Sequence, residues 1–179
     1  MKITFGSYLQ ASQLLQADPR VWDAIAILDS DLALSPRISD FAQRHVVLRF
    51  DDITSAEQCK RLVEQADVLR AMEFVEESEA CVVTCRAGQS RSAALAFALA
   101  YHLIGADAAA QLLNPRRHIP NLKVAEVASA ALQNPAILQA LVDWKHAHRD
   151  YRLADYYDEI EAEYDELERE SVVNCVSER

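Results

Sequence analysis

Apolar residues gather in short segments in the first half of the chain, whereas the second half is mostly helical in pattern. The short segments are rich in valine and isoleucine, and each has the length of a buried strand. They span Lys2–Phe5, Ala24–Leu28, His45–Phe50 and Ala80–Thr84. Helical or loop sequence separates each segment from the next, which is typical of a mainly parallel sheet covered by helices on both faces. The sequence therefore predicts an α/β fold with a central sheet of four to five strands.

Helices are expected between and after these strands. Thr54 is followed three residues later by Glu57, a capping-box pattern that predicts a helix from Thr54 to about Glu77. Gly105 has the place of a helix C-cap. Further helices are expected over residues 106–113, 121–132 and 137–148. We interpret residues 1–148 as one domain, and residues 149–179 as an acidic helical extension that packs on the domain or projects from it.

Charge and cysteine content narrow the classes of function. The formal net charge is −10 at pH 7, and the C-terminal extension contributes much of it. No basic surface for nucleic acid or an anionic membrane is recognisable, and neither a signal peptide nor a membrane span is apparent. The cysteines show no zinc-ligand spacing and no CxxC pairs, which favours free thiols in a reducing compartment. We therefore expect a cytoplasmic protein with no nucleic-acid or membrane partner, no metal and no cofactor.

A candidate anion-binding loop follows the fourth predicted strand. It begins at Cys85 and ends six residues later at Arg91, a spacing that alone is a weak signal. Gly88 lies in the middle, where the backbone must turn and approach a ligand closely. The sequence after Arg91 is strongly helical, so backbone N–H groups and the positive helix end converge on one point. The pattern predicts that phosphate is bound by Arg86, Ala87, Gly88, Gln89, Ser90 and Arg91.

The same loop would activate Cys85 as a nucleophile. The helix N-terminus and the guanidinium of Arg91 favour its thiolate form. Arg91 presents a planar fork that can hold two phosphoryl oxygens, most strongly in the transition state. Ser92 can donate a hydrogen bond to the sulfur and help it leave a phospho-enzyme. A buried cysteine at a strand end is the alternative, but it leaves Gly88 and Arg91 unexplained.

At these residues the sequence resembles the protein tyrosine phosphatase superfamily, most closely its compact dual-specificity branch and bacterial relatives. The family motif is His-Cys-x5-Arg-Ser/Thr, and residues 84–92 match it except at Thr84. In the family the histidine orients the loop and tunes the thiolate, whereas a threonine carries no charge. The resemblance also implies that Asn121, which follows Pro120, orders the neighbourhood of the loop. Its sequence position fits a helix N-cap equally well.

Cleavage of a phosphate ester also needs a proton for the leaving oxygen. The family places an aspartate roughly 30 residues before the cysteine, after the preceding strand. Asp51 and Asp52 occupy that position here, at the edge of the sheet where α/β sites form. Asp52, 33 residues before Cys85, is the first choice for the acid, and Asp51 is the second. Two adjacent carboxylates repel, so one of them can retain a proton. Alternatively, one or both carboxylates only cap the helix expected from Thr54.

These residues favour a phosphatase that hydrolyses phosphotyrosine or a similar monoester through a cysteinyl-phosphate intermediate. Its partner would be a phosphorylated protein or a small phosphomonoester; the sequence does not fix the oligomeric state. The first alternative is a catalytically weak pseudophosphatase, suggested by Thr84. A sulfurtransferase or arsenate reductase is less favoured, because the length and position of the loop differ. Redox control through pairing of Cys59 or Cys81 with Cys85 is a further hypothesis.

Overall fold

A parallel four-stranded sheet forms the centre of the computed structural model, which describes residues 1–29 and 32–150. Its strands are β1 (Lys2–Ser7), β2 (Asp23–Leu28), β3 (His45–Arg49) and β4 (Ala80–Cys85). Their order across the sheet is β1-β4-β2-β3, so β4 lies in the interior with a strand on either side. All four segments expected from the sequence are strands, and the α/β class with a mainly parallel sheet is confirmed.

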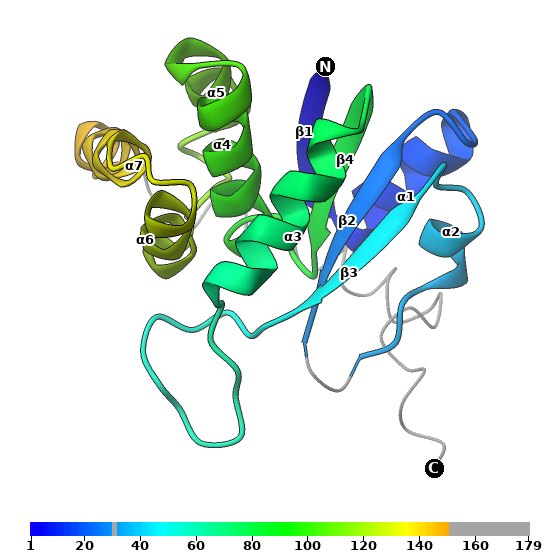
Figure 1. Cartoon of the computed structure of the whole chain (residues 1–179), viewed down its shortest axis with the longest axis horizontal. Helices are drawn as coiled ribbons and strands as arrows, with labels where there is room; N and C mark the ends of the chain where they lie inside the picture. Colours follow the sequence, from blue (N-terminus) through cyan, green and yellow to red (C-terminus); the bar gives the residue numbers. More distant parts are fainter. Residues whose placement is uncertain (30–31, 151–179) are drawn as a thin grey trace.

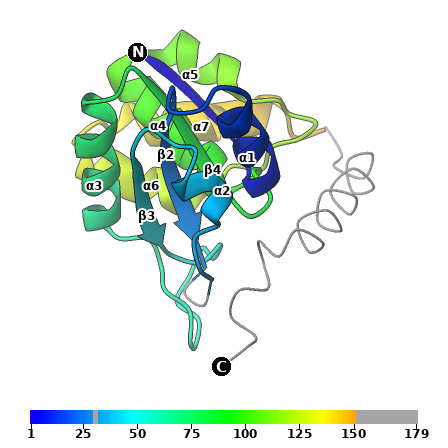
Figure 2. The same cartoon turned by 90° about the vertical axis from the view of Figure 1, so that its right-hand side faces the viewer.

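Helices cover both faces of the sheet (Figure 1). On one face lie α1 (Tyr8–Ala17) and the short α2 (Pro36–Ser39). On the other lie α3 (Gln65–Glu76) and α4 (Arg91–Leu103). Figure 2 shows the same layers from the side of α1. Side chains alternate along β4, so that Val83 and Cys85 join the larger core with α4, whereas Val82 joins the smaller core with α1.

The central helix α4 buries its first ten residues, from Arg91 to Ala100. Alanines dominate this segment and let the neighbouring elements approach closely. Behind it pack α5 (Ala106–Leu112), α6 (Leu122–Ala131) and α7 (Ala136–Ala147), close to the expected bounds. The C-cap of α4 is Ile104, one residue before the expected Gly105. Gly105 has a φ of 121°, donates to the carbonyl of Ala100 at 3.0 Å and is the N-cap of α5.

The helix expected from Thr54 to about Glu77 is wrong in its first half. Residues 51–64 form a loop, and α3 begins only at Gln65. The Asp67 carboxylate accepts from the backbone N–H of Glu64 at 2.9 Å and so caps this later start. Cys59 has a φ of 62°, which is incompatible with a continuous helix. The capping pattern at Thr54 therefore belongs to a loop that returns toward the sheet edge.

The acidic helical extension expected over residues 149–179 lies almost entirely outside the described residues. Within residues 1–29 and 32–150, none of the helices combines the length and apolar character needed to cross a lipid bilayer.

Candidate active site

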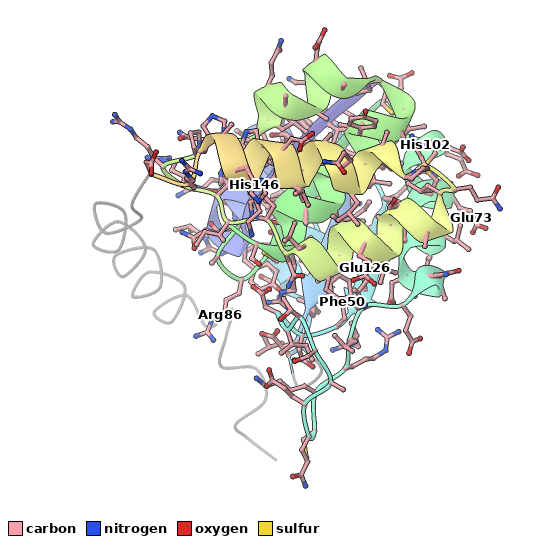
Figure 3. The ribbon with its side chains drawn as sticks, turned by 90° about the vertical axis from the view of Figure 1, so that its left-hand side faces the viewer. Phe50, Glu73, Arg86, His102, Glu126 and His146 are labelled. Carbon is pink, nitrogen blue, oxygen red and sulfur yellow. The ribbon has the colours of Figure 1, made fainter. Side chains whose placement is uncertain are left out.

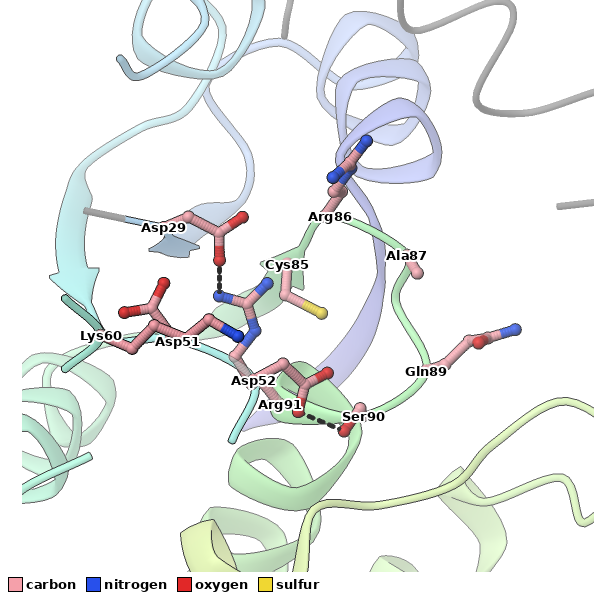
Figure 4. A pocket seen from close by; sticks show the side chains of 10 residues that line it. All are labelled: Asp29, Asp51, Asp52, Lys60, Cys85, Arg86, Ala87, Gln89, Ser90 and Arg91. Atoms are coloured by element: carbon pink, nitrogen blue, oxygen red, sulfur yellow. Dashed lines mark hydrogen bonds and ion pairs between the residues drawn. The ribbon is translucent and has the colours of Figure 1, made fainter. Parts of the chain in front are cut away.

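A pocket of about 470 Å³ opens at the carboxyl ends of the strands, around the loop between β4 and α4 (Figure 4). This edge is where ligands bind in parallel α/β sheets. Its lining consists of Asp29, Asp51, Asp52, Lys60, Cys85, Arg86, Ala87, Gln89, Ser90 and Arg91. The structure thus brings the predicted nucleophile, the arginine and both candidate acids to one pocket.

Gly88 allows the loop to pack against the junction of β1 and α1. Its φ is 67°, in the left-handed region that favours glycine. A Cβ at this position would lie 2.9 Å from the carbonyl oxygen of Gly6 and still closer to the backbone nitrogen of Ser7. Because these atoms are backbone at a capped helix start, they cannot move aside cheaply. The conformation of the loop therefore requires glycine at residue 88.

Cys85 ends β4 and is buried, with its Sγ 3.1 Å from the hydroxyl oxygen of Ser92. Ser92 is the second residue of α4, so the sulfur lies beside the N-terminal turn of that helix. Backbone N–H groups at this turn and their dipole favour negative charge. The arrangement suits a thiolate that accepts a hydrogen bond from a neighbouring hydroxyl.

Arg91 is held rigidly, with only 3% of its surface exposed. Its Nη1 donates to Oδ1 of Asp29 at 2.5 Å and to the carbonyl of Phe50 at 2.8 Å. Its Nε is buried and has no hydrogen-bond partner among the described residues. Burial lowers the pKa of Arg91, but nearby Cys85 and Asp29 outweigh it and leave that pKa above its ordinary value. The guanidinium is therefore a fixed cation with an unused donor.

Asp29 and Tyr8 are parts of this site that the sequence reasoning missed. Asp29 directly follows β2 and forms the ion pair with Arg91. Tyr8 donates its hydroxyl to the carbonyl of Ile27, and burial, followed by the charge of Cys85, raises the pKa of Tyr8 well above its ordinary value. A polar residue after a buried strand was a usable signal for Asp29. Tyr8, at the start of α1, gave no comparable signal.

Asp52 is held by two donors from separate segments. Its Oδ1 accepts from the hydroxyl of Ser90 at 2.7 Å and from Nδ2 of Asn121 at 2.8 Å. The Asn121 side chain also accepts from the backbone N–H of Lys123 at 2.9 Å, at the start of α6. Both interpretations of Asn121 are therefore compatible with one geometry, because it caps α6 and also orients Asp52.

Asp51 lines the same pocket but is bound differently. Its Oδ2 accepts from the backbone N–H of Arg61 at 2.7 Å, and its own N–H donates to the carbonyl of Arg61 at 2.8 Å. These two bonds close the loop that carries Lys60 toward the pocket. Asp51 contributes to the shape of this loop, whereas Asp52 contacts the loop between β4 and α4 directly through Ser90.

The remaining predicted loop residues differ in exposure. Arg86 projects outward at the rim (Figure 3), and the carbonyls of Gln89 and Ser90 accept from the N–H groups of Ile119 and Asn121. Thr84 is fully buried, and its hydroxyl has no partner among the described residues. Because side chains alternate along a strand, it points away from the face that carries Cys85.

The structure excludes one of the two cysteine pairings expected as a redox control of the site. Cys81 and Cys85 lie four residues apart on one strand, which separates their Cα atoms by about 13 Å. A disulfide needs a separation below about 7 Å, so pairing of Cys81 with Cys85 is excluded. Burial, with a smaller effect of Asp23, raises the pKa of Cys81 to about 12. Within the described part of the chain, no group of three or more side chains could bind a metal ion.

Comparison with known proteins shows which solved structures share this fold. No protein-family model matches the sequence, and no curated protein matches it. Among solved structures, PTPMT1 in complex with PI(5)P is 14% identical, covers 79% of this chain and 94% of its own, and has a TM-score of 0.52. The human tyrosine phosphatase-like serine/threonine/tyrosine-interacting protein is 20% identical, with 75% and 87% covered and a TM-score of 0.50.

The chain therefore shares its fold with these two solved structures, one of PTPMT1 and one of a tyrosine phosphatase-like protein. The fold that the resemblance implied is therefore confirmed. At these identities the likeness concerns the architecture of the sheet and helices, so the chemistry must be argued from the pocket itself.

Proposed function

We propose that the chain is a phosphatase of the cysteine-dependent, dual-specificity-like type that hydrolyses phosphate monoesters at Cys85. The observation that supports this most is the buried, unpaired Nε of Arg91 beside the Cys85 pocket. An unsatisfied buried donor costs roughly 1–3 kcal/mol, and more when the group is charged. A phosphoryl oxygen bound by the loop would offset that cost, and no other group in the described structure does so.

In the first step, the Cys85 thiolate attacks phosphorus and an S–P bond forms as the ester P–O bond breaks. Asp52 gives its proton to the leaving oxygen, so the alcohol departs neutral. Arg91 and the N–H groups of residues 86–91 hold the phosphoryl oxygens, on which charge accumulates in the transition state. Asn121 and Ser90 keep the Asp52 carboxyl in position for the transfer.

In the second step, water attacks phosphorus and the S–P bond breaks. Asp52, now a carboxylate, takes a proton from that water. Ser92 donates to the departing sulfur, which leaves as a thiolate, and inorganic phosphate is released. The enzyme returns to its starting protonation state, and the overall reaction consumes one water molecule.

A pseudophosphatase that binds phosphorylated partners is the second candidate. Thr84 favours it, because its buried hydroxyl has no partner and cannot provide the charge of a histidine. The human structural neighbour is likewise described as phosphatase-like and as an interacting protein. A pseudophosphatase would bind the phosphate group in the same pocket but would not hydrolyse the ester efficiently.

Hydrolysis of p-nitrophenyl phosphate by wild type, Cys85→Ser and Cys59→Ser separates the two candidates. Cys59 is exposed and does not line the pocket, so Cys59→Ser is the matched control. We expect wild type and Cys59→Ser to release p-nitrophenol and Cys85→Ser to fall to background. Equal rates for wild type and Cys85→Ser would refute the phosphatase. Calorimetric binding of phosphate without turnover would favour the pseudophosphatase.

A further inference from the structure

Three carboxylates surround the mouth of the pocket, and each has one oxygen bonded to the protein. Asp29 uses Oδ1 for Arg91, Asp51 uses Oδ2 for the N–H of Arg61, and Asp52 uses Oδ1 for two side chains. For the second oxygen of each carboxylate, the described residues provide no hydrogen-bond donor. All three side chains line the pocket (Figure 4). In the proposed reaction the second oxygen of Asp52 carries the acidic proton. The open acceptors beside the nucleophile are therefore the second oxygens of Asp29 and Asp51.

The buried Nε of Arg91 independently identifies this pocket as a ligand site. That donor lies at the Cys85 end and fits the phosphoryl group. With phosphate on the loop, the alcohol part of a substrate extends toward the carboxylates and Lys60. The pocket volume of about 470 Å³ falls within the range typical of small-molecule sites, roughly 300–1,000 Å³.

The chemistry of the wall discriminates between leaving groups. No aromatic side chain lines the pocket in the described structure, and its only apolar lining residues are Ala87 and the nucleophile Cys85. An aromatic ring placed there would remove the open carboxylate oxygens from water without giving them a hydrogen bond, which is unfavourable. Hydroxyl groups would each supply one donor. The Lys60 ammonium can in turn donate to hydroxyl oxygens.

We infer that the substrate is a phosphate monoester of a hydroxyl-rich alcohol, such as a sugar or polyol, and that Asp29 and Asp51 accept from its hydroxyl groups. This inference rests on the proposed phosphatase function. It differs from the phosphotyrosine ester expected from the sequence. The same hydroxyl-rich chemistry occurs in free polyol phosphates and in inositol headgroups of lipids.

The test compares kcat/KM for four probes with purified full-length protein. These are sorbitol 6-phosphate, myo-inositol 1-phosphate, a phosphotyrosine peptide, and a phosphatidylinositol monophosphate in phosphatidylcholine vesicles. We expect at least one hydroxyl-rich probe to exceed the peptide by about tenfold, because a hydrogen bond to a carboxylate contributes about that factor. A higher kcat/KM for the soluble probes would identify a free polyol phosphate as the substrate, and a higher value for the vesicles would identify a lipid headgroup. Preference for the peptide over all three would overturn the inference.

A variant tests whether the carboxylate wall causes the preference. Asp51→Asn keeps an oxygen for the N–H of Arg61 but replaces the open oxygen by an NH2 donor. We expect the ratio of kcat/KM for the preferred hydroxyl-rich probe to that for the peptide to fall about tenfold. Asp143→Asn, on the exposed side of α7, removes the same charge far from the pocket and should leave the ratio unchanged.

An unchanged ratio in Asp51→Asn, or an equal fall in Asp143→Asn, would overturn the role of the wall. The comparison of the four probes uses wild-type protein only. It can therefore still refute the inference if Asp51→Asn fails to fold. If no probe is hydrolysed in a Cys85-dependent manner, the proposed function fails and the substrate inference fails with it. Cys85-dependent turnover of the peptide alone would remove the substrate inference and keep the phosphatase.

Discussion

Substitution of Gly88 by alanine should damage both the stability of the protein and its affinity for phosphate. A φ of 67° costs a non-glycine residue about 1–2 kcal/mol. The new Cβ would also lie 2.9 Å from the carbonyl oxygen of Gly6 and closer to the backbone nitrogen of Ser7. Overpacking of this kind typically costs a further 1–3 kcal/mol. Relief of the contact requires the loop to move away from β1, which displaces the N–H groups that would bind phosphate.

Gly105→Ala is the matched control for backbone strain. Gly105 has a φ of 121°, and a Cβ there would meet no atom within 4 Å. We expect its free energy of unfolding to fall by about 1–3 kcal/mol, with p-nitrophenyl phosphate hydrolysis unchanged. In Gly88→Ala the free energy of unfolding should fall by about 2–5 kcal/mol, and most of the kcat/KM for p-nitrophenyl phosphate should be lost. Urea denaturation and the hydrolysis assay together measure both quantities. Retention of wild-type kcat/KM by Gly88→Ala would refute the packing argument for this loop.

Three further predictions concern other residues. Asn121→Ala removes the α6 cap and a donor to Asp52, so unfolding free energy should fall by about 1 kcal/mol. Its kcat for an alkyl phosphate should fall more than for p-nitrophenyl phosphate, whose leaving group needs no proton; equal falls would contradict this. Ser92→Ala should slow release of phosphate from Cys85, giving a rapid-quench burst of p-nitrophenol; a slow first turnover would contradict it. Burial, aided by Arg117, lowers the pKa of His118 to about 4, below its unfolded value near 6.5. The unfolded chain binds more protons between these values, so stability should decrease by up to about 3 kcal/mol as pH falls from 6.5 to 4. Urea midpoints of wild type and His118→Asn across that range measure this, and parallel curves would refute it.

The sheet and the tight loop between β4 and α4 could be predicted because their determinants are local. Three of the four strands contain a continuous apolar run, as buried parallel strands require, and β1 places Ile3 and Phe5 around Thr4. The loop combines Cys85, Gly88 and Arg91 within seven residues at a strand-to-helix junction. Gly88 was informative because the chain contains only 3 glycines. Local sequence thus determined which segments form the centre of the fold.

The helix after β3 could not be predicted correctly, because long-range contacts override its capping pattern. Thr54 and Glu57 fit a helix start, yet Glu57 instead pairs with Lys60 at 2.8 Å in the loop. Two hydrogen bonds between Asp51 and Arg61 close that loop at its base. Neither bond has a signature in the sequence, because the partners lie ten residues apart without periodic spacing. Tertiary closure outweighs local helix propensity here.

The orientation of Arg91 shows why Asp29 matters although no local motif contains it. A guanidinium has five donors in a fixed plane, and a phosphoryl group needs two of them along one edge. Asp29 and the carbonyl of Phe50 both bind Nη1, so rotation that would turn Nη1 toward the ligand breaks two hydrogen bonds at once. The edge formed by Nε and Nη2 is then left for the anion, and Nε is buried with no partner among the described residues. Asp29, Phe50 and Arg91 come from three separate segments of the chain, and only the parallel order β4-β2-β3 brings them together. The site therefore depends on strand order as much as on the Cys85–Arg91 motif, and the motif alone would leave the arginine without a defined direction.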